Sequence, residues 1–171
     1  MDDRFRKASE RMSMKCQHFA HDAVSVASIP LTDASGKAAL MGNFRGQSNL
    51  VLLFSHGLGC QHCQWLVEQL ATQSQELIFA DAQVLVVQPS NATREASLSF
   101  PMHLVWDCEG AAWHKFARLI EQPVTQDDIL VVILDRYGAL QAACSVSHGN
   151  DGNLVAEILE YLKFIAIQCP E

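Results

Sequence analysis

The stretch Leu50-Val-Leu-Leu-Phe54-Ser-His-Gly-Leu-Gly59-Cys-Gln-His-Cys63 decides the fold of this chain. Its first five residues form a continuous apolar run of strand length, which is typical of a strand buried on both faces. A loop with two glycines follows, and two cysteines then flank Gln61 and His62. The stretch therefore predicts a buried strand, a short loop and a C-x-x-C dithiol in direct succession.

The residues from Gln61 to about Ala80 predict a helix that starts at the dithiol. Apolar residues recur there at helical spacing, and glutamine, glutamate and threonine occupy the other side. The apolar residues are Cys63, Leu66, Val67, Leu70, Ala71, Leu77 and Ile78, and Trp65 falls off this stripe. The pattern places Cys60 at the helix N-terminus and Cys63 within the first turn.

The rest of the chain alternates between predicted strands and helices. This alternation predicts an α/β fold with a βαβ core, and the hairpin after Asp135 adds an antiparallel edge. The predicted strands are 24–30, 84–87, 102–106, 129–134 and 139–146, and the further predicted helices are 91–99, 109–119 and 154–167. Residues 1–22 read as a polar N-terminal extension, and residues 23–171 as a single domain.

Length, charge and hydropathy exclude several classes of protein. A chain of 171 residues buries enough core for one domain without a disulfide scaffold. A net charge of −7 argues against nucleic-acid binding. No apolar run approaches the roughly 20 residues of a membrane span, and the start lacks the apolar region of a secretion signal. We therefore expect a cytoplasmic protein in which the six cysteines are mostly reduced.

Several landmarks in order resemble the thioredoxin superfamily, in particular its redoxin branch of peroxiredoxins (AhpC/TSA-like proteins) and thiol-disulfide reductases. They are the C-x-x-C after a buried strand, Phe44-Arg45-Gly46, Phe100-Pro101 with Asp107 and Gly110, and Ile133-Leu-Asp-Arg-Tyr-Gly138. The resemblance covers roughly residues 24–165. It implies a thioredoxin-like fold, with a central mixed sheet of about five strands flanked by helices, and thiol-dependent redox or antioxidant chemistry without a cofactor.

The sequence departs from both branches at their partner residues. Thioredoxin-like reductases carry a proline before the third core strand, and Ile129 stands at about that position. Peroxiredoxins carry P-x-x-x-T-x-x-C. With Cys63 as the peroxidatic cysteine of that motif, His56 replaces the proline and Cys60 replaces the threonine. Peroxiredoxins also carry a later arginine, and no arginine stands directly before the strand that ends at Leu134.

The dithiol has the surroundings that thiol chemistry needs. The thiolate is the nucleophile in disulfide exchange, and a helix N-terminus favours it through unpaired N–H groups and the helix dipole. His62 would further favour a thiolate at Cys60, and His56 in the loop could act likewise. Trp65 either helps to dock a partner or packs against a neighbouring loop. The candidate catalytic residues are therefore Cys60, Cys63 and His62, with His56 and Trp65 in support.

Three functions remain open. In a thiol-disulfide oxidoreductase Cys60 attacks a disulfide and Cys63 resolves the mixed disulfide. In a peroxidase a hydroperoxide oxidises Cys63 to a sulfenic acid, and Cys60 condenses with it. The third function is a redox-sensing or metal-binding module without turnover, with His56 or His62 as a ligand. Because a second ligand pair at zinc spacing is absent from the sequence, we expect no bound metal.

The expected partners follow from these functions. They are protein or small-molecule disulfides or hydroperoxides and a thiol electron donor such as a thioredoxin, with no nucleic acid and no membrane. Among the other cysteines, Cys108 is either a third redox thiol or incidental, and Cys144 is expected in the core. Cys16 and Cys169, near the two ends, could resolve a sulfenic acid, as terminal cysteines do in some peroxiredoxins.

Overall fold

The fold is built on a six-stranded mixed sheet. The computed structural model describes residues 15–18, 29–39, 41–94, 96–120, 123–147 and 153–168. The strands lie in the order β1-β6-β5-β2-β3-β4. β2, β3 and β4 are parallel, whereas β5 runs antiparallel to β2, β6 to β5 and β1 to β6. Their bounds are β1 Lys15–His18, β2 Asn49–Phe54, β3 Ala82–Pro89, β4 Met102–Asp107, β5 Ile129–Leu134 and β6 Leu140–Val146.

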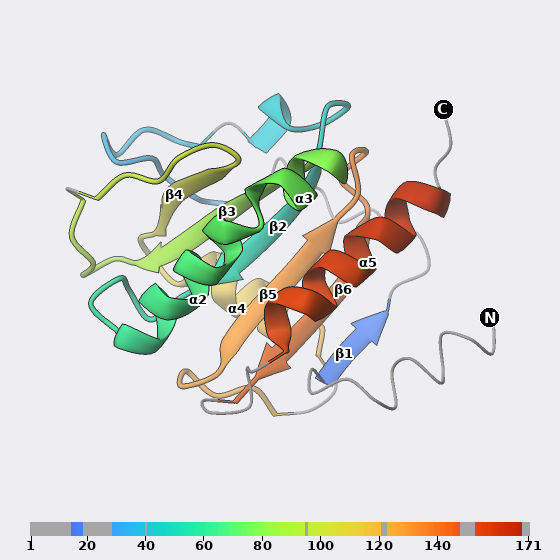
Figure 1. The fold of residues 1–171 in the computed structure, drawn as a ribbon. Helices are drawn as coiled ribbons and strands as arrows, with labels where there is room; N and C mark the ends of the chain where they lie inside the picture. The colour runs from blue at the N-terminus through green and yellow to red at the C-terminus, as the bar shows by residue number, and fades with distance from the viewer. Residues whose placement is uncertain are drawn as a thin grey trace.

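Helices cover both faces of the sheet. In Figure 1, α2, α3 and α5 lie across the near face, and α4 lies behind the sheet. Their bounds are α2 Gln61–Thr72, α3 Ser74–Phe79, α4 Ala111–Ala117 and α5 Leu154–Gln168. A 3-10 turn, η2, spans Met41–Asn43. None of the helices in the described ranges is long and apolar enough to cross a bilayer.

The central strands β2 and β5 are almost entirely apolar because both of their faces are buried. All six residues of β2 and all six of β5 are buried. Val51 and Leu53 belong to the core under α2 and α5, whereas Leu52 and Phe54 belong to the core that includes Phe116 of α4. The continuous apolar run from Leu50 to Phe54 therefore has the cause expected from the sequence.

The predicted fold class is confirmed, and one strand of the sheet, β1, was not predicted. β1 lies within the segment predicted to be a polar extension, and its sequence Lys-Cys-Gln-His carries no apolar alternation that would reveal it. Most of the strand predicted at 24–30 falls outside the described residues, and Ile29 and Pro30 are not in a strand. The division into residues 1–22 and 23–171 stays a prediction.

Two helix predictions need correction. The helix predicted from Gln61 to about Ala80 is two helices, because the backbone leaves helical geometry at Gln73, with φ −99° and ψ 17°. The helix predicted at 91–99 is not formed at 91–94 or 96–99, which are turns, bends and irregular chain. Asn91, Thr93 and Ser97 lie in that segment, and such side chains compete with helical backbone bonds.

Candidate active site

The loop after β2 delivers Cys60 to the start of α2. Cys60 is the N-cap residue, with the extended backbone (φ −80°, ψ 115°) that this position requires. Its N–H donates to the carbonyl of Gly57 at 3.0 Å, and its carbonyl accepts from the N–H of Gln64 at 2.9 Å. The dithiol thus straddles the first turn of α2, as the sequence predicts.

A buried glutamine on the neighbouring strand holds this loop in place. Gln88, at 2% exposure, accepts from the N–H of Leu58 at 3.1 Å and donates to the hydroxyl of Ser55 at 2.8 Å. The same hydroxyl donates to the carbonyl of Val87 at 3.1 Å. Gly57, at φ +105°, supplies the turn that other residues rarely adopt. β3 therefore fixes the path of the loop from residue 55 to residue 58.

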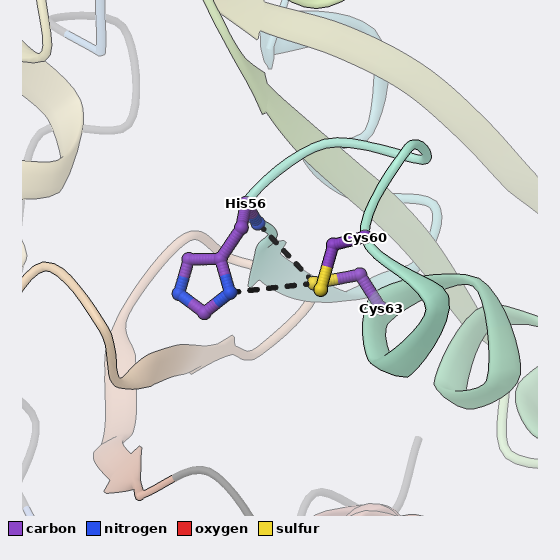
Figure 2. Close-up of side chains that lie close together, drawn as sticks. All are labelled: His56, Cys60 and Cys63. Atoms are coloured by element: carbon purple, nitrogen blue, oxygen red, sulfur yellow. Dashed lines mark hydrogen bonds between the residues drawn. The ribbon is translucent and has the colours of Figure 1, made fainter.

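The loop brings His56 onto the dithiol. The backbone N–H of His56 donates to the Sγ of Cys63 at 3.3 Å, and the ring Nδ1 lies 3.6 Å from the same sulfur. Figure 2 shows the imidazole pointing at the two sulfurs. One side-chain atom each from His56, Cys60 and Cys63 lies within 4.8 Å of the others. These are the three positions that correspond to proline, threonine and cysteine in the peroxiredoxin motif.

The two cysteines differ in burial and therefore in chemistry. Cys63 is 1% exposed, whereas Cys60 is partly exposed. Burial raises the pKa of the Cys63 thiol to about 11, and the neighbouring Cys60 adds to that rise, whereas the N–H of His56 opposes it. At neutral pH Cys63 is therefore a protonated thiol beneath a more accessible partner.

His62 and Trp65 lie together on the surface of α2. Their rings stack with centroids 6.4 Å apart and an interplanar angle of 25°, and Trp65 is 42% exposed. The structure thus gathers His56, Cys60 and Cys63 into one cluster and pairs His62 with Trp65 beside it. The catalytic role expected of His62 stays a prediction.

Sequence reasoning missed Gln88. The sequence shows only a polar residue directly after the apolar run from Val84 to Val87, and that pattern fits an exposed strand end as well as a buried amide. Burial of the Gln88 amide costs free energy unless its oxygen and nitrogen form hydrogen bonds, and the loop after β2 supplies the partners.

The other cysteines fall at separate places. Cys144 is buried in β6, as expected, and is disulfide-bonded, which was not expected. The register of β1 on β6 places the Cα of Cys16 opposite that of Cys144. Cys108 follows β4 and is exposed. Cys169 lies outside the described residues.

The cluster also has donor atoms that suit a soft metal ion. Thiolate and imidazole ligands favour Cu(I) or Zn²⁺. The three donors are those of His56, Cys60 and Cys63, and both sulfurs would have to lose their protons to bind. A structural zinc site needs four ligands, and the described residues bring three together here.

Comparisons with known proteins identify the fold. No family model and no curated protein matches the chain. Peroxiredoxin Q of Xanthomonas campestris is 17% identical with a TM-score of 0.65, over 88% of this chain and 99% of that one. A 2-Cys peroxiredoxin of Plasmodium vivax is 15% identical with a TM-score of 0.58, over 81% and 90%.

A third similar structure belongs to another redoxin group. BsSco, a member of the Sco family of cytochrome c oxidase assembly proteins, is 12% identical with a TM-score of 0.57, over 81% of this chain and 90% of that one. The architecture is thus the thioredoxin-like fold. The solved structures to which this chain is similar include peroxiredoxin Q, a 2-Cys peroxiredoxin and a Sco protein.

The unequal burial predicts unequal alkylation of the two thiols. At pH 7 the reduced protein should label with iodoacetamide at Cys60 at least about tenfold faster than at Cys63, because so little Cys63 is ionised. Labelling of Cys63 should then rise with pH toward about 11. Peptide mass spectrometry with fragmentation separates the two sites.

Cys60→Ala is the control for this measurement. Burial, the larger cause of the raised Cys63 pKa, remains in that variant, so Cys63 should still label slowly at pH 7. Rapid labelling of Cys63 at neutral pH, in the wild type or in the variant, would contradict the assignment.

Proposed function

We propose that this protein is a thiol-disulfide oxidoreductase in which Cys60 is the nucleophile and Cys63 the resolving cysteine. The observation that carries the proposal is the arrangement of the two thiols. Cys60 caps α2 and reaches solvent, whereas Cys63 lies one turn further on, buried, with a pKa raised to about 11. A helix N-terminus stabilises a thiolate within its first turn, so the accessible cysteine is also the favoured anion.

The reaction runs in two exchanges. The Cys60 thiolate attacks one sulfur of a substrate disulfide, and the substrate S–S bond breaks as the mixed disulfide forms. The leaving sulfur takes up a proton. The thiol of Cys63 then gives its proton to a base and attacks the Cys60 sulfur, which releases the second substrate thiol. The Nδ1 of His56, 3.6 Å from Cys63 Sγ, is positioned to accept that proton.

The oxidised pair must be reduced again for turnover. A thiol donor such as a thioredoxin would do this by the same exchange in reverse. Trp65, exposed on α2 five residues after Cys60, offers an apolar surface on which a protein partner could dock. His62 beside it would favour the Cys60 thiolate. The location we expect is the cytoplasm, where most thiols are kept reduced, and the disulfide at Cys144 would be an exception there.

A peroxidase reaction is the main alternative. It is supported by the similarity to peroxiredoxin Q, and by Cys63 standing at the peroxidatic position of the motif. Cys63 would attack the hydroperoxide O–O bond, become a sulfenic acid and release an alcohol or water, and Cys60 would then condense with it. The 1% exposure and raised pKa of Cys63 disfavour this order of events.

Two serine variants distinguish these reactions. Cys63→Ser should accumulate a mixed disulfide with oxidised insulin, because attack survives and resolution does not, and Cys60→Ser should accumulate none. Non-reducing gels and intact mass report the adduct, and Cys169→Ser is the control for cysteine removal as such. If instead Cys60→Ser consumes one equivalent of cumene hydroperoxide and yields a dimedone adduct, whereas Cys63→Ser traps nothing, the protein is a peroxidase.

Metal binding is a second candidate because three soft donors converge at His56, Cys60 and Cys63. We expect less than about 0.1 zinc or copper per chain after purification without added metal, since a structural site needs a fourth ligand. Elemental analysis measures this. About one metal ion per chain in the wild type, lost in both Cys60→Ser and His56→Ala, would make a metal-binding module the better description.

A further inference from the structure

A cavity of about 520 Å³ opens where the three parallel strands end. Phe54, Pro89 and Asp107 are the last residues of β2, β3 and β4, and all three line it. Ligands of α/β proteins bind beyond the carboxyl ends of parallel strands, and the volume is within the range of small-molecule pockets. The cysteines of the C-x-x-C are not among its lining residues, so the cavity is a separate feature of the fold.

The lining carries a thiol at the far strand. His56 follows β2 and Cys108 follows β4, with the end of β3 between them. Neighbouring strands are about 4.8 Å apart, which puts the ends of β2 and β4 roughly 10 Å from each other. A molecule that fills the cavity can therefore span from His56, after the end of β2, to Cys108, after the end of β4.

Cys108 sits against a guanidinium that the protein holds in place. Nη2 of Arg94 lies 3.4 Å from the Sγ of Cys108, and Oγ1 of Thr32 lies 3.3 Å from it. Nη1 of Arg94 donates to the carbonyl of Asp33 at 2.8 Å, and the guanidinium lies 5.0 Å from the ring centroid of Trp106. A fixed cation with N–H donors directed at a sulfur stabilises the negative charge that thiol exchange requires.

We propose that this cavity is a second thiol-exchange site, which binds a low-molecular-weight disulfide bearing ammonium groups and joins one half of it to Cys108. The proposal does not depend on the function proposed for Cys60 and Cys63. It combines a cavity of ligand size, an exposed thiol on its wall and a positioned guanidinium behind that thiol.

The charge of the lining selects the ligand. Three carboxylates line the cavity, those of Asp107, Glu109 and Asp128, and its described lining holds no lysine or arginine. The rings of Phe54 and Trp113 supply apolar wall for a short carbon chain. With a net charge of −7 on the whole chain, an ammonium-bearing ligand is favoured over an anionic one.

The exchange step balances without any further reactant. The Cys108 thiolate attacks one sulfur of the bound disulfide, the ligand's S–S bond breaks, and a bond between Cys108 Sγ and that sulfur forms. The other half leaves as a thiolate and takes up the proton that Cys108 gave up. The small disulfide is the oxidant, and the products are an S-thiolated Cys108 and one free small thiol.

The test compares three small disulfides on a Cys60→Ser/Cys63→Ser chain, in which the dithiol cannot react. Cystamine, neutral hydroxyethyl disulfide and anionic glutathione disulfide are each incubated with this variant and with a reduced peptide of residues 105–110, and Cys108 adducts are followed by peptide mass spectrometry. Dividing each protein rate by the peptide rate removes the intrinsic reactivity of the reagent. In the wild type, tryptic peptides 46–94 and 95–115 separate Cys60 and Cys63 from Cys108, so the same kinetics can be read without any substitution.

We expect the rate with cystamine to saturate as its concentration rises, and its protein-to-peptide ratio to exceed that of glutathione disulfide by about tenfold. Arg94→Gln should lower the rate of adduct formation about tenfold, whereas Arg118→Gln, a matched exposed arginine, should leave it unchanged. If the rate of adduct formation stays linear in the concentration of every disulfide and equals the rate of the peptide, Cys108 is only an exposed thiol. Saturation with glutathione disulfide in preference to cystamine would overturn the ligand class. None of these outcomes depends on whether Cys60 and Cys63 reduce disulfides.

Discussion

The hydrogen bond from the backbone of His56 to the sulfur of Cys63 is the contact on which the site depends. It joins the loop that leaves β2 to the first turn of α2, over 3.3 Å. Because Gln88 fixes the same loop from β3, the dithiol is held at the carboxyl ends of β2 and β3 rather than on a free helix end. The two thiols therefore have unequal surroundings, since Cys60 is partly exposed and Cys63 is buried.

That inequality gives the two sulfurs different chemistry. Exchange needs a nucleophile that meets the substrate and a second thiol that waits in protonated form until the mixed disulfide exists. In the proposed reaction, Cys60 at the N-cap would take the first task and Cys63, with its raised pKa, the second. The imidazole of His56 adds a proton acceptor beside the second thiol, where the proline of the peroxiredoxin motif would supply none.

Much of the fold could be predicted because its central strands are buried on both faces and so read as continuous apolar runs, as in Leu50 to Phe54 and Ile129 to Leu134. The edge strand Lys15–His18 could not, since an edge needs little apolar content. The position of Cys60 and Cys63 at the start of a helix could be predicted from a C-x-x-C motif after a strand. The contact of His56 with Cys63 could not be predicted, because it depends on a loop path that Gln88 sets. The cavity could not be predicted either, because it combines the ends of three strands that lie far apart in sequence.

The central claim is that Cys60 and Cys63 act as one two-electron couple, and an equilibrium redox titration tests it most directly. The protein is equilibrated in glutathione buffers of increasingly oxidising potential and quenched with acid. The mass of tryptic peptide 46–94, which contains both cysteines, is then measured. We expect a single transition in which the peptide loses two hydrogens, with a midpoint between about −270 and −120 mV, the range of thioredoxin-like dithiols. A peptide that instead keeps Cys63 reduced while Cys60 carries glutathione at every potential would contradict it.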